Sequence, residues 1–216
     1  MRKLLAVTIL LSIFSVSGCG EGRREPMSKK QVRGDLIYIV NEESPYTGMI
    51  FATHANGQLS NERHYKDGKI HGISKSWYEN GQLKAVASFK EDKGHGILKK
   101  WYENRQIKLE AFYKEGKIHG ISKAWYENGQ LKAEDSYKDG KLHGISKSWY
   151  ENGQLEAEIS NKDGKQDGIL KEWYENGQLK AVTSLKDSKL DGVSKIWDED
   201  GKLIREITYK DGVEVK

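Results

Sequence analysis

The chain has 216 residues, of which 36% are hydrophobic and 31% are charged, so few apolar side chains are available for a compact core. Glycine is abundant (23 residues), proline is nearly absent (2), and six tryptophans and eleven tyrosines are present, a composition that favours short aromatic strands joined by tight turns. The formal charge of +4 is spread along the chain without a basic block, which argues against a nucleic-acid partner.

Residues 1–18 have the layout of an export signal. Arg2 and Lys3 form a positive start, and the apolar stretch 4–16 that follows is too short to span a bilayer. Two small residues then precede Cys19, which resembles the lipobox of bacterial lipoproteins and implies cleavage before Cys19 and lipidation of its thiol. We expect an exported protein held at a bacterial membrane by this lipid, at the outer membrane in a Gram-negative cell. The alternative is an ordinary secretory signal followed by an unmodified cysteine.

The segment after the cysteine divides into a tether and a cap. Residues 19–34 carry mixed charge without apolar periodicity, which predicts a flexible tether. Residues 35–47 are expected to form a lead-in strand and cap, and residues 48–216 the main folded array. Since Cys19 is the only cysteine, its lipidation leaves no thiol for a disulfide or a thiolate metal site.

An internal repeat of 24 residues dominates the rest of the chain. All six tryptophans follow this period, and so do seven glycines from Gly48 to Gly192, which define seven units. The first unit has Thr53 where the others have tryptophan, as expected of a terminal repeat.

Each unit contains two turn signals that separate two strand-length runs. In the unit 120–143 the turns are Asn128-Gly129 and Asp139-Gly140, and the runs are GISKAWY and QLKAEDSY. The sequence therefore predicts an all-β fold, an elongated, twisted antiparallel meander of about 14 short strands.

The length of each turn decides which side chains share a face. A three-residue loop at 127–129 places Trp125 opposite Leu131, whereas a two-residue loop would place Tyr126 there. With three-residue loops at both turns, odd positions share one face throughout, and that face collects most apolar residues, including Ile121 and Tyr137. We favour this arrangement because it gives a one-sided sheet, although mixed loop types would redistribute whole columns.

The motif Trp149–Leu155 (WYENGQL) and the lead-in Pro45–Gly48 (PYTG) resemble the MORN-repeat variant of bacterial YwqK-type proteins, over residues 36–216. The resemblance implies an elongated antiparallel sheet of hairpins and a role in protein interaction. Members of that family are commonly labelled antitoxins. The lipobox at Cys19 departs from this label, because a cytoplasmic antitoxin does not need one.

The repeats argue against a catalytic site, because every polar residue in them is duplicated and no irregular polar cluster stands out. We therefore expect no enzyme, no catalytic residue and no cofactor. A histidine column also follows the period, but equivalent positions lie ~9.6 Å apart, whereas zinc needs each nitrogen at ~2.0 to 2.1 Å. No metal site is expected in this column, which consists of His71, His95, His119 and His143.

The most interesting candidate binding surface combines the tryptophans with a lysine two residues before each of them. One interpretation is a continuous aromatic core covered by lysine stems. The other is a ligand surface whose rings repeat at ~9.6 Å, near the length of a disaccharide, and which would suit an envelope glycan. The residues are Trp77, Trp101, Trp125, Trp149, Trp173, Trp197, Lys75, Lys99, Lys123, Lys147, Lys171 and Lys195.

Together these features predict a lipid-anchored, non-catalytic interaction or scaffold module of the bacterial cell envelope. Its partners would be the membrane, through the lipid on Cys19, and a protein or envelope glycan bound by the repeats. The alternative is an antitoxin or immunity protein that neutralises a co-encoded toxin by direct binding.

Overall fold

The computed structural model describes residues 22–215 as an all-β molecule, with no α-helix in that range and one short 3-10 turn, η1 (Met27–Lys29). The predicted export signal and Cys19 lie outside the described residues.

Each repeat of the array consists of two strands. In two repeats the first strand is interrupted before a glycine and therefore carries two labels, β10 with β11 and β15 with β16. In chain order the strands are β4 (Gly48–Thr53), β5 (Leu59–Lys66), β6 (Lys69–Trp77), β7 (Leu83–Lys90), β8 (Lys93–Trp101), β9 (Ile107–Lys114), β10 (Lys117–Ile118), β11 (Gly120–Trp125), β12 (Leu131–Lys138), β13 (Lys141–Trp149), β14 (Leu155–Lys162), β15 (Lys165–Gln166), β16 (Gly168–Trp173), β17 (Leu179–Lys186), β18 (Lys189–Trp197), β19 (Leu203–Lys210) and β20 (Val213–Val215).

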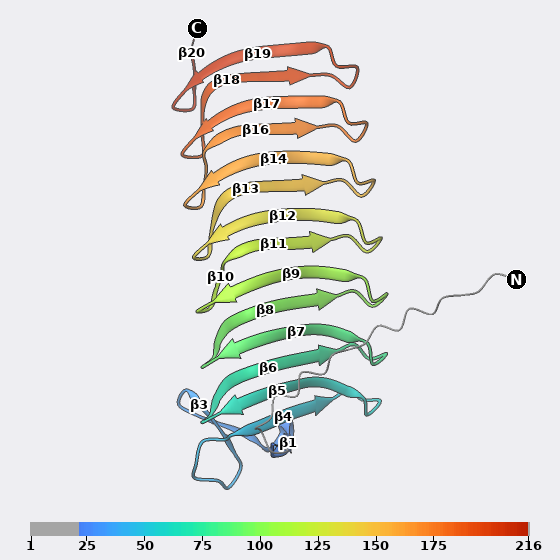
Figure 1. Cartoon of the computed structure of the whole chain (residues 1–216), viewed down its shortest axis with the longest axis vertical. Coiled ribbons are helices and arrows are strands. Elements are labelled where there is room, and N and C mark those ends of the chain that lie inside the picture. Colours follow the sequence, from blue (N-terminus) through green and yellow to red (C-terminus); the bar gives the residue numbers. More distant parts are fainter. Residues whose placement is uncertain (1–21, 216) are drawn as a thin grey trace, which may run out of the picture.

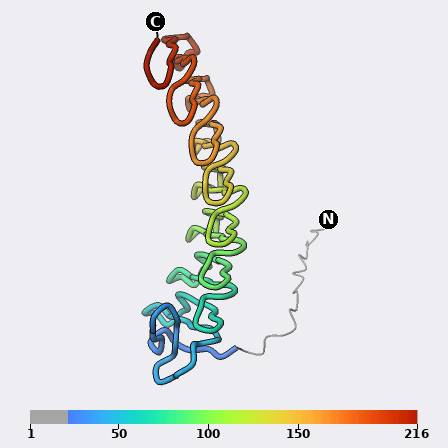
Figure 2. The backbone as a smooth tube through the Cα atoms, turned by 90° about the vertical axis from the view of Figure 1, so that its left-hand side faces the viewer, coloured from blue at the N-terminus to red at the C-terminus, as the bar shows by residue number. Residues whose placement is uncertain are grey.

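Each strand of the array pairs antiparallel with the next one in the chain, so the sheet is a meander. The predicted fold class is confirmed: one long, twisted sheet of hairpins, with the strands stacked along the molecule and bent in the same direction (Figure 1; Figure 2). All Asp-Gly turns lie along one long edge and all Asn-Gly loops along the other (Figure 1).

The N-terminal part of the described chain covers the first repeat. Strand β1 (Arg24–Pro26) pairs parallel with β4, while β2 (Lys30–Arg33) and β3 (Leu36–Ile39) form a separate hairpin. A cluster of buried side chains forms a small core here, namely Ile39, Tyr46, Ile50 and Tyr65. The prediction of a flexible tether is therefore wrong for residues 22–34, because β1 satisfies the backbone groups of the β4 edge and Met27 packs against this core.

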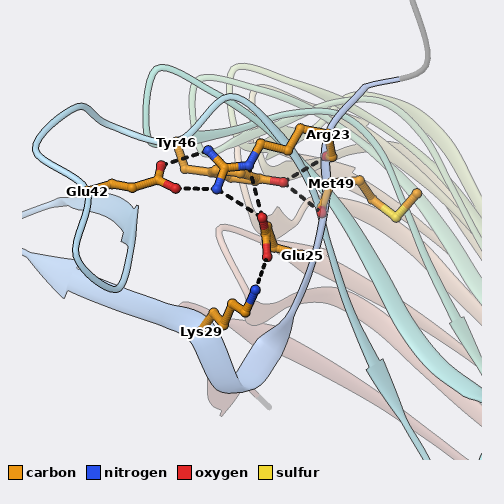
Figure 3. A network of polar contacts seen from close by, with 6 residues as sticks. All are labelled: Arg23, Glu25, Lys29, Glu42, Tyr46 and Met49. Carbon is orange, nitrogen blue, oxygen red and sulfur yellow. Dashed lines mark hydrogen bonds and ion pairs between the residues drawn. The ribbon is translucent and has the colours of Figure 1, made fainter.

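A polar network fastens β1 to the segment that leads into the array (Figure 3). The Arg23 guanidinium donates hydrogen bonds to the carboxylates of Glu25 and Glu42, and the Lys29 ammonium lies 3.0 Å from Glu25. The Tyr46 hydroxyl lies 2.8 Å from the Arg23 carbonyl oxygen. Hydrogen bonds from Lys29 and Arg23 lower the pKa of Glu25, and that of Arg23 lowers the pKa of Glu42.

The Asn-Gly loops have the predicted three-residue form. The Tyr126 amide donates to the Gln130 carbonyl at 2.9 Å, and Gly129 has a φ of 86°, in the left-handed region that glycine tolerates. Trp125 is opposite Leu131, as predicted.

The prediction that odd positions share one face is wrong, because two irregularities in each repeat shift the register. Trp125 is opposite Leu131, but its neighbour Ala124 is opposite Ala133. Lys132 therefore has no partner on the other strand and forms a bulge. The Asp139-Gly140 turn has two residues instead of three, since its flanking lysines are directly opposite each other. Both central residues have positive φ, 51° and 83°, as a type I′ turn requires.

The two shifts cancel over one repeat, so each face is the same in every unit. Tyr137 shares a face with Ala133, and we call it the inner face because it holds the buried residues of the array, such as Ala111 (2% exposed), Ile159 and Ala181. Ile121 lies on the opposite, outer face and is 53% exposed.

Candidate interaction surface

A row of exposed aliphatic side chains runs along the outer face. One residue in each of six repeats contributes, directly after the periodic glycine, which has a positive φ. We call this set the isoleucine row: Ile73 (47% exposed), Ile97 (47%), Ile121 (53%), Ile145 (46%), Ile169 (51%) and Val193 (38%). Such a regular apolar stripe is unusual on a free surface and is typical of an interaction site.

A row of alternating charges runs beside the isoleucine row, two residues further along the strands. Successive strands place lysine opposite glutamate across the sheet, so that Glu110, for example, lies between Lys99 and Lys123. The ion pairs are Lys99–Glu110 (3.2 Å), Lys123–Glu134 (2.9 Å), Lys147–Glu158 (2.9 Å) and Lys195–Glu206 (3.2 Å). The hydrogen bond that Lys147 donates to the Glu158 carboxylate raises the pKa of Lys147.

The tryptophans are all partly buried and end the strands that carry these rows. Strand alternation puts each of them on the outer face with the lysine two residues earlier. Their carbonyl oxygens accept hydrogen bonds from the tyrosine hydroxyls of the preceding repeats: Tyr78 to Trp101 (2.7 Å), Tyr102 to Trp125 (2.8 Å), Tyr126 to Trp149 (2.8 Å), Tyr150 to Trp173 (2.9 Å) and Tyr174 to Trp197 (2.9 Å). This ladder fixes the spacing of the tryptophans.

The structure therefore places the predicted tryptophans and lysines on one face but changes the character of that surface. Four of the six lysines are paired with glutamate, so the positive charge expected between the rings is largely neutralised. Only Lys75 and Lys171 are opposite valine on the next strand, Val86 and Val182, and both lysines are exposed.

The sequence interpretation missed the isoleucine row, because it placed these residues on one apolar face together with Tyr137. It also missed Phe112, which lies opposite Ile97 on the outer face and is 42% exposed. Four other repeats have serine at the position of Phe112, and the first and last repeats have His64 and Thr208. An alignment of the repeats would have shown this substitution, a large apolar residue in a column of polar side chains.

Three of the four histidines in this column, His95, His119 and His143, each approach an acid of the next Asp-Gly type turn. The Nδ1 atoms of His95 and His143 lie 3.4 and 3.3 Å from carboxylate oxygens of Glu115 and Asp163. Within residues 22–215, no three histidine, cysteine or acidic side chains lie together as a metal site would require, and no helix is long and apolar enough to cross a membrane.

The surface of the array also has shallow hollows between neighbouring Asn-Gly loops. One of about 450 Å³ is lined by aromatic and polar groups, including His54, Trp77 and Tyr78, with Glu79 and Glu103 at its sides. It is open to solvent, and the same loop geometry recurs from repeat to repeat.

Comparison with known proteins identifies the family of these repeats. The family model described as MORN repeat variant matches five segments, which together make up about half of the chain: residues 70–91, 118–139, 142–163, 166–187 and 190–211. The two remaining hairpins, β4–β5 and β8–β9, have the same strand pairing and bulge as the matched ones. No curated protein matches the chain significantly. The five matched segments and the hairpin geometry show that the chain belongs to the MORN repeat variant family.

Proposed function

We propose that this protein is a non-catalytic binding module whose outer face docks a protein partner at the cell envelope. The observation that carries the proposal is the isoleucine row, six aliphatic side chains that are between 38% and 53% exposed in successive repeats. MORN repeats often mediate protein or membrane interactions, and this surface supports the first of these roles.

The chemistry of the outer face favours a protein over other ligands. Half-exposed aliphatic side chains gain most from burial against another apolar surface, at about 25 cal/mol per Å². The neighbouring charge row carries both signs, so a partner with its own alternating charges would match it, whereas a uniformly charged surface would not. Phe112, beside Ile97, adds the aromatic side chain that interface centres commonly contain.

Substitution of the isoleucine row tests the proposal. We expect Ile121→Ser with Ile145→Ser to abolish partner capture by cross-linking in intact cells, while the fold is retained because both side chains are already half exposed. Ile204→Ser with Val213→Ser is the matched control, since these residues are at least as exposed but lie outside the row. Capture that is unchanged in the first pair, or lost equally in both, would contradict the proposal.

An envelope glycan is the second candidate, and it would use the tryptophans. The observation in its favour is that Lys75 and Lys171, beside Trp77 and Trp173, are exposed and have no ion pair among the described residues. Each is opposite valine on the next strand and glutamate on the preceding one. Cell-wall pull-downs with Trp77→Ala and Trp173→Ala should then lose binding, provided that circular dichroism shows the variants to be folded. Binding equal to wild type would exclude this surface as the glycan site.

The envelope location rests on the lipidation proposed at Cys19. Replacement of this residue by serine should release the protein from the membrane fraction, because no acylated thiol remains. Unchanged membrane fractionation would reject the anchor and leave the binding surface as a separate question.

An antitoxin or immunity role would use the same protein-binding face, with a toxin as the partner. It is tested by expressing neighbouring open reading frames in cells that lack this gene. The role is supported if a neighbouring reading frame kills cells, the wild type prevents this death, and Ile121→Ser with Ile145→Ser does not prevent it. Cells that remain viable in every case would exclude the role.

A further inference from the structure

The two long edges of the array carry opposite charge. The basic edge consists of the Asp-Gly type turns, 66–69, 90–93, 114–117, 138–141, 162–165, 186–189 and 210–213, which together hold thirteen lysines and eight acids. The acidic edge consists of the Asn-Gly type loops, 79–81, 103–105, 127–129, 151–153, 175–177 and 199–201, which hold seven acids and one arginine. Because all turns of one kind lie on one side, the separation of charge extends along the whole molecule (Figure 1).

The basic edge contains an arrangement that does not favour the fold itself. In six turns two lysines are directly opposite each other across the hairpin: Lys66–Lys69, Lys90–Lys93, Lys114–Lys117, Lys138–Lys141, Lys162–Lys165 and Lys186–Lys189. Like charges in directly opposite positions destabilise a sheet. All twelve side chains are exposed, and within residues 22–215 only Lys165 among them has an ion pair, with Asp187. The repeated lysine pairs therefore point to an anionic partner outside the chain.

The acidic edge has a complementary arrangement. Each of its loops begins with an exposed glutamate, and none of these glutamates has an ion pair within the described part of the chain. The loop backbone is held rigidly, as in Asn128, whose side-chain amide donates to the Glu151 carbonyl at 3.0 Å. The glutamates are thus presented at fixed intervals of ~9.6 Å, two strand spacings.

A second copy of the chain supplies an anionic surface with the same spacing as the lysine pairs. We propose that copies of this protein associate side by side, the basic edge of one against the acidic edge of the next. Both edges repeat every 24 residues, so the six glutamates of one copy have the same spacing as the six lysine pairs of the other. The contact joins two different edges, so each copy keeps one edge free and the assembly grows laterally.

Salt dependence distinguishes association through the charged edges from association through apolar surface. We expect the purified full chain, in a nonionic detergent that masks residues 4–16, to sediment as oligomers at 50 mM salt. The apparent dissociation constant should rise at least about tenfold at 500 mM salt, because exposed charges are screened. Association through apolar surface would not weaken with salt, and a chain that is monomeric at 50 mM salt would overturn the proposal.

Complementary variants give the sharper test. An acidic-edge variant replaces the six loop glutamates by glutamine, and a basic-edge variant replaces the first lysine of each pair by glutamine. Each variant alone should be monomeric, whereas a mixture of the two should form heterodimers and nothing larger, since each variant keeps one working edge. Self-association of either variant alone, or no association in the mixture, would overturn the proposal.

Two further measurements control for charge and for other anions. Lys114→Gln with Lys138→Gln should weaken association, while Lys75→Gln with Lys171→Gln, which removes the same charge from the outer face, should not. An equal effect of both pairs would overturn the edge contact. A wild type that is monomeric at 50 mM salt and yet is retained on immobilised inorganic polyphosphate would assign the basic edge to a polyanion and overturn self-association. Neither result bears on partner capture by the isoleucine row, so this inference and the proposed function fail independently.

Discussion

At the scale of single residues, neighbouring repeats are held together by side chains of one repeat that bond the backbone of the next. The Tyr126 hydroxyl donates to the Trp149 carbonyl at 2.8 Å, and the Asn128 amide donates to the Glu151 carbonyl. Burial raises the pKa of Tyr126, so its hydroxyl remains protonated as a donor. These bonds connect loops that are not consecutive in sequence and keep the outer-face rows aligned.

Removal of one such hydroxyl should cost a measurable part of the stability. We expect Tyr126→Phe to lower the free energy of unfolding by about 1 kcal/mol, the usual net value of a neutral hydrogen bond. Tyr65→Phe is the matched control, because the Tyr65 hydroxyl is buried without a partner among the described residues and its loss should be neutral or stabilising. Urea denaturation of both variants checks this, and equal destabilisation would contradict the hydrogen-bond ladder.

A second residue-scale prediction concerns Arg105. It stands where other repeats have the loop glycine, yet it adopts the same left-handed conformation, with a φ of 70°. This conformation costs a non-glycine residue roughly 1 kcal/mol. Arg105→Gly should therefore raise the urea midpoint, whereas Arg105→Ala should not. A midpoint that falls in Arg105→Gly would show that the arginine side chain stabilises the loop.

At the scale of elements, the cap formed by β1 should respond to acid before the array does. The pKa of Glu25 and that of Glu42 are lower in the folded chain than their ordinary value of 4.5, so these groups bind protons more readily when unfolded. Their contribution is present above pH ~4.5 and is lost as the pH falls below it, through the folded pKa values. Hydrogen exchange should show β1 losing protection in this range relative to β12, and Glu42→Gln should reduce the pH dependence. Equal loss in β1 and β12 would contradict a separate cap.

The sequence allowed the strands and the Asn-Gly loop to be predicted, but not the faces of the sheet. Trp125 opposite Leu131 followed from turn chemistry, since Asn-Gly has few favourable loop forms. The bulge at Lys132 and the two-residue turn at Asp139-Gly140 each shift side chains to the other face, and nothing in a single strand distinguishes their registers. This is why Ile121 was assigned to the same face as Tyr137. The fold of residues 22–34 was missed for another reason: its strands β1 and β2 pair with β4 and β3, which lie outside this segment.

At the scale of the whole molecule, each repeat contacts mainly its neighbours, so the array should tolerate changes in length. Deletion of residues 120–143 removes one full unit and restores the same junction, because the two register shifts cancel within a repeat. We expect a folded protein that is shorter by ~9.6 Å in small-angle scattering. Deletion of residues 120–131 instead removes one strand and should prevent folding. A folded product of the shorter deletion would contradict the hairpin pair as the repeating unit.

The rows on the outer face exist only at this scale, because each repeat after the first contributes one aliphatic residue, one lysine and one strand-end tryptophan. The central claim is that this face, and not the inner one, is the binding surface. The most direct measurement is site-specific photo-cross-linking in intact cells, with a photoreactive amino acid at Ile121 or at the adjacent inner-face position Ser122. We predict a protein adduct of one defined mass from position 121 and none from 122. Adducts from position 122 alone, or from both positions equally, would contradict the claim.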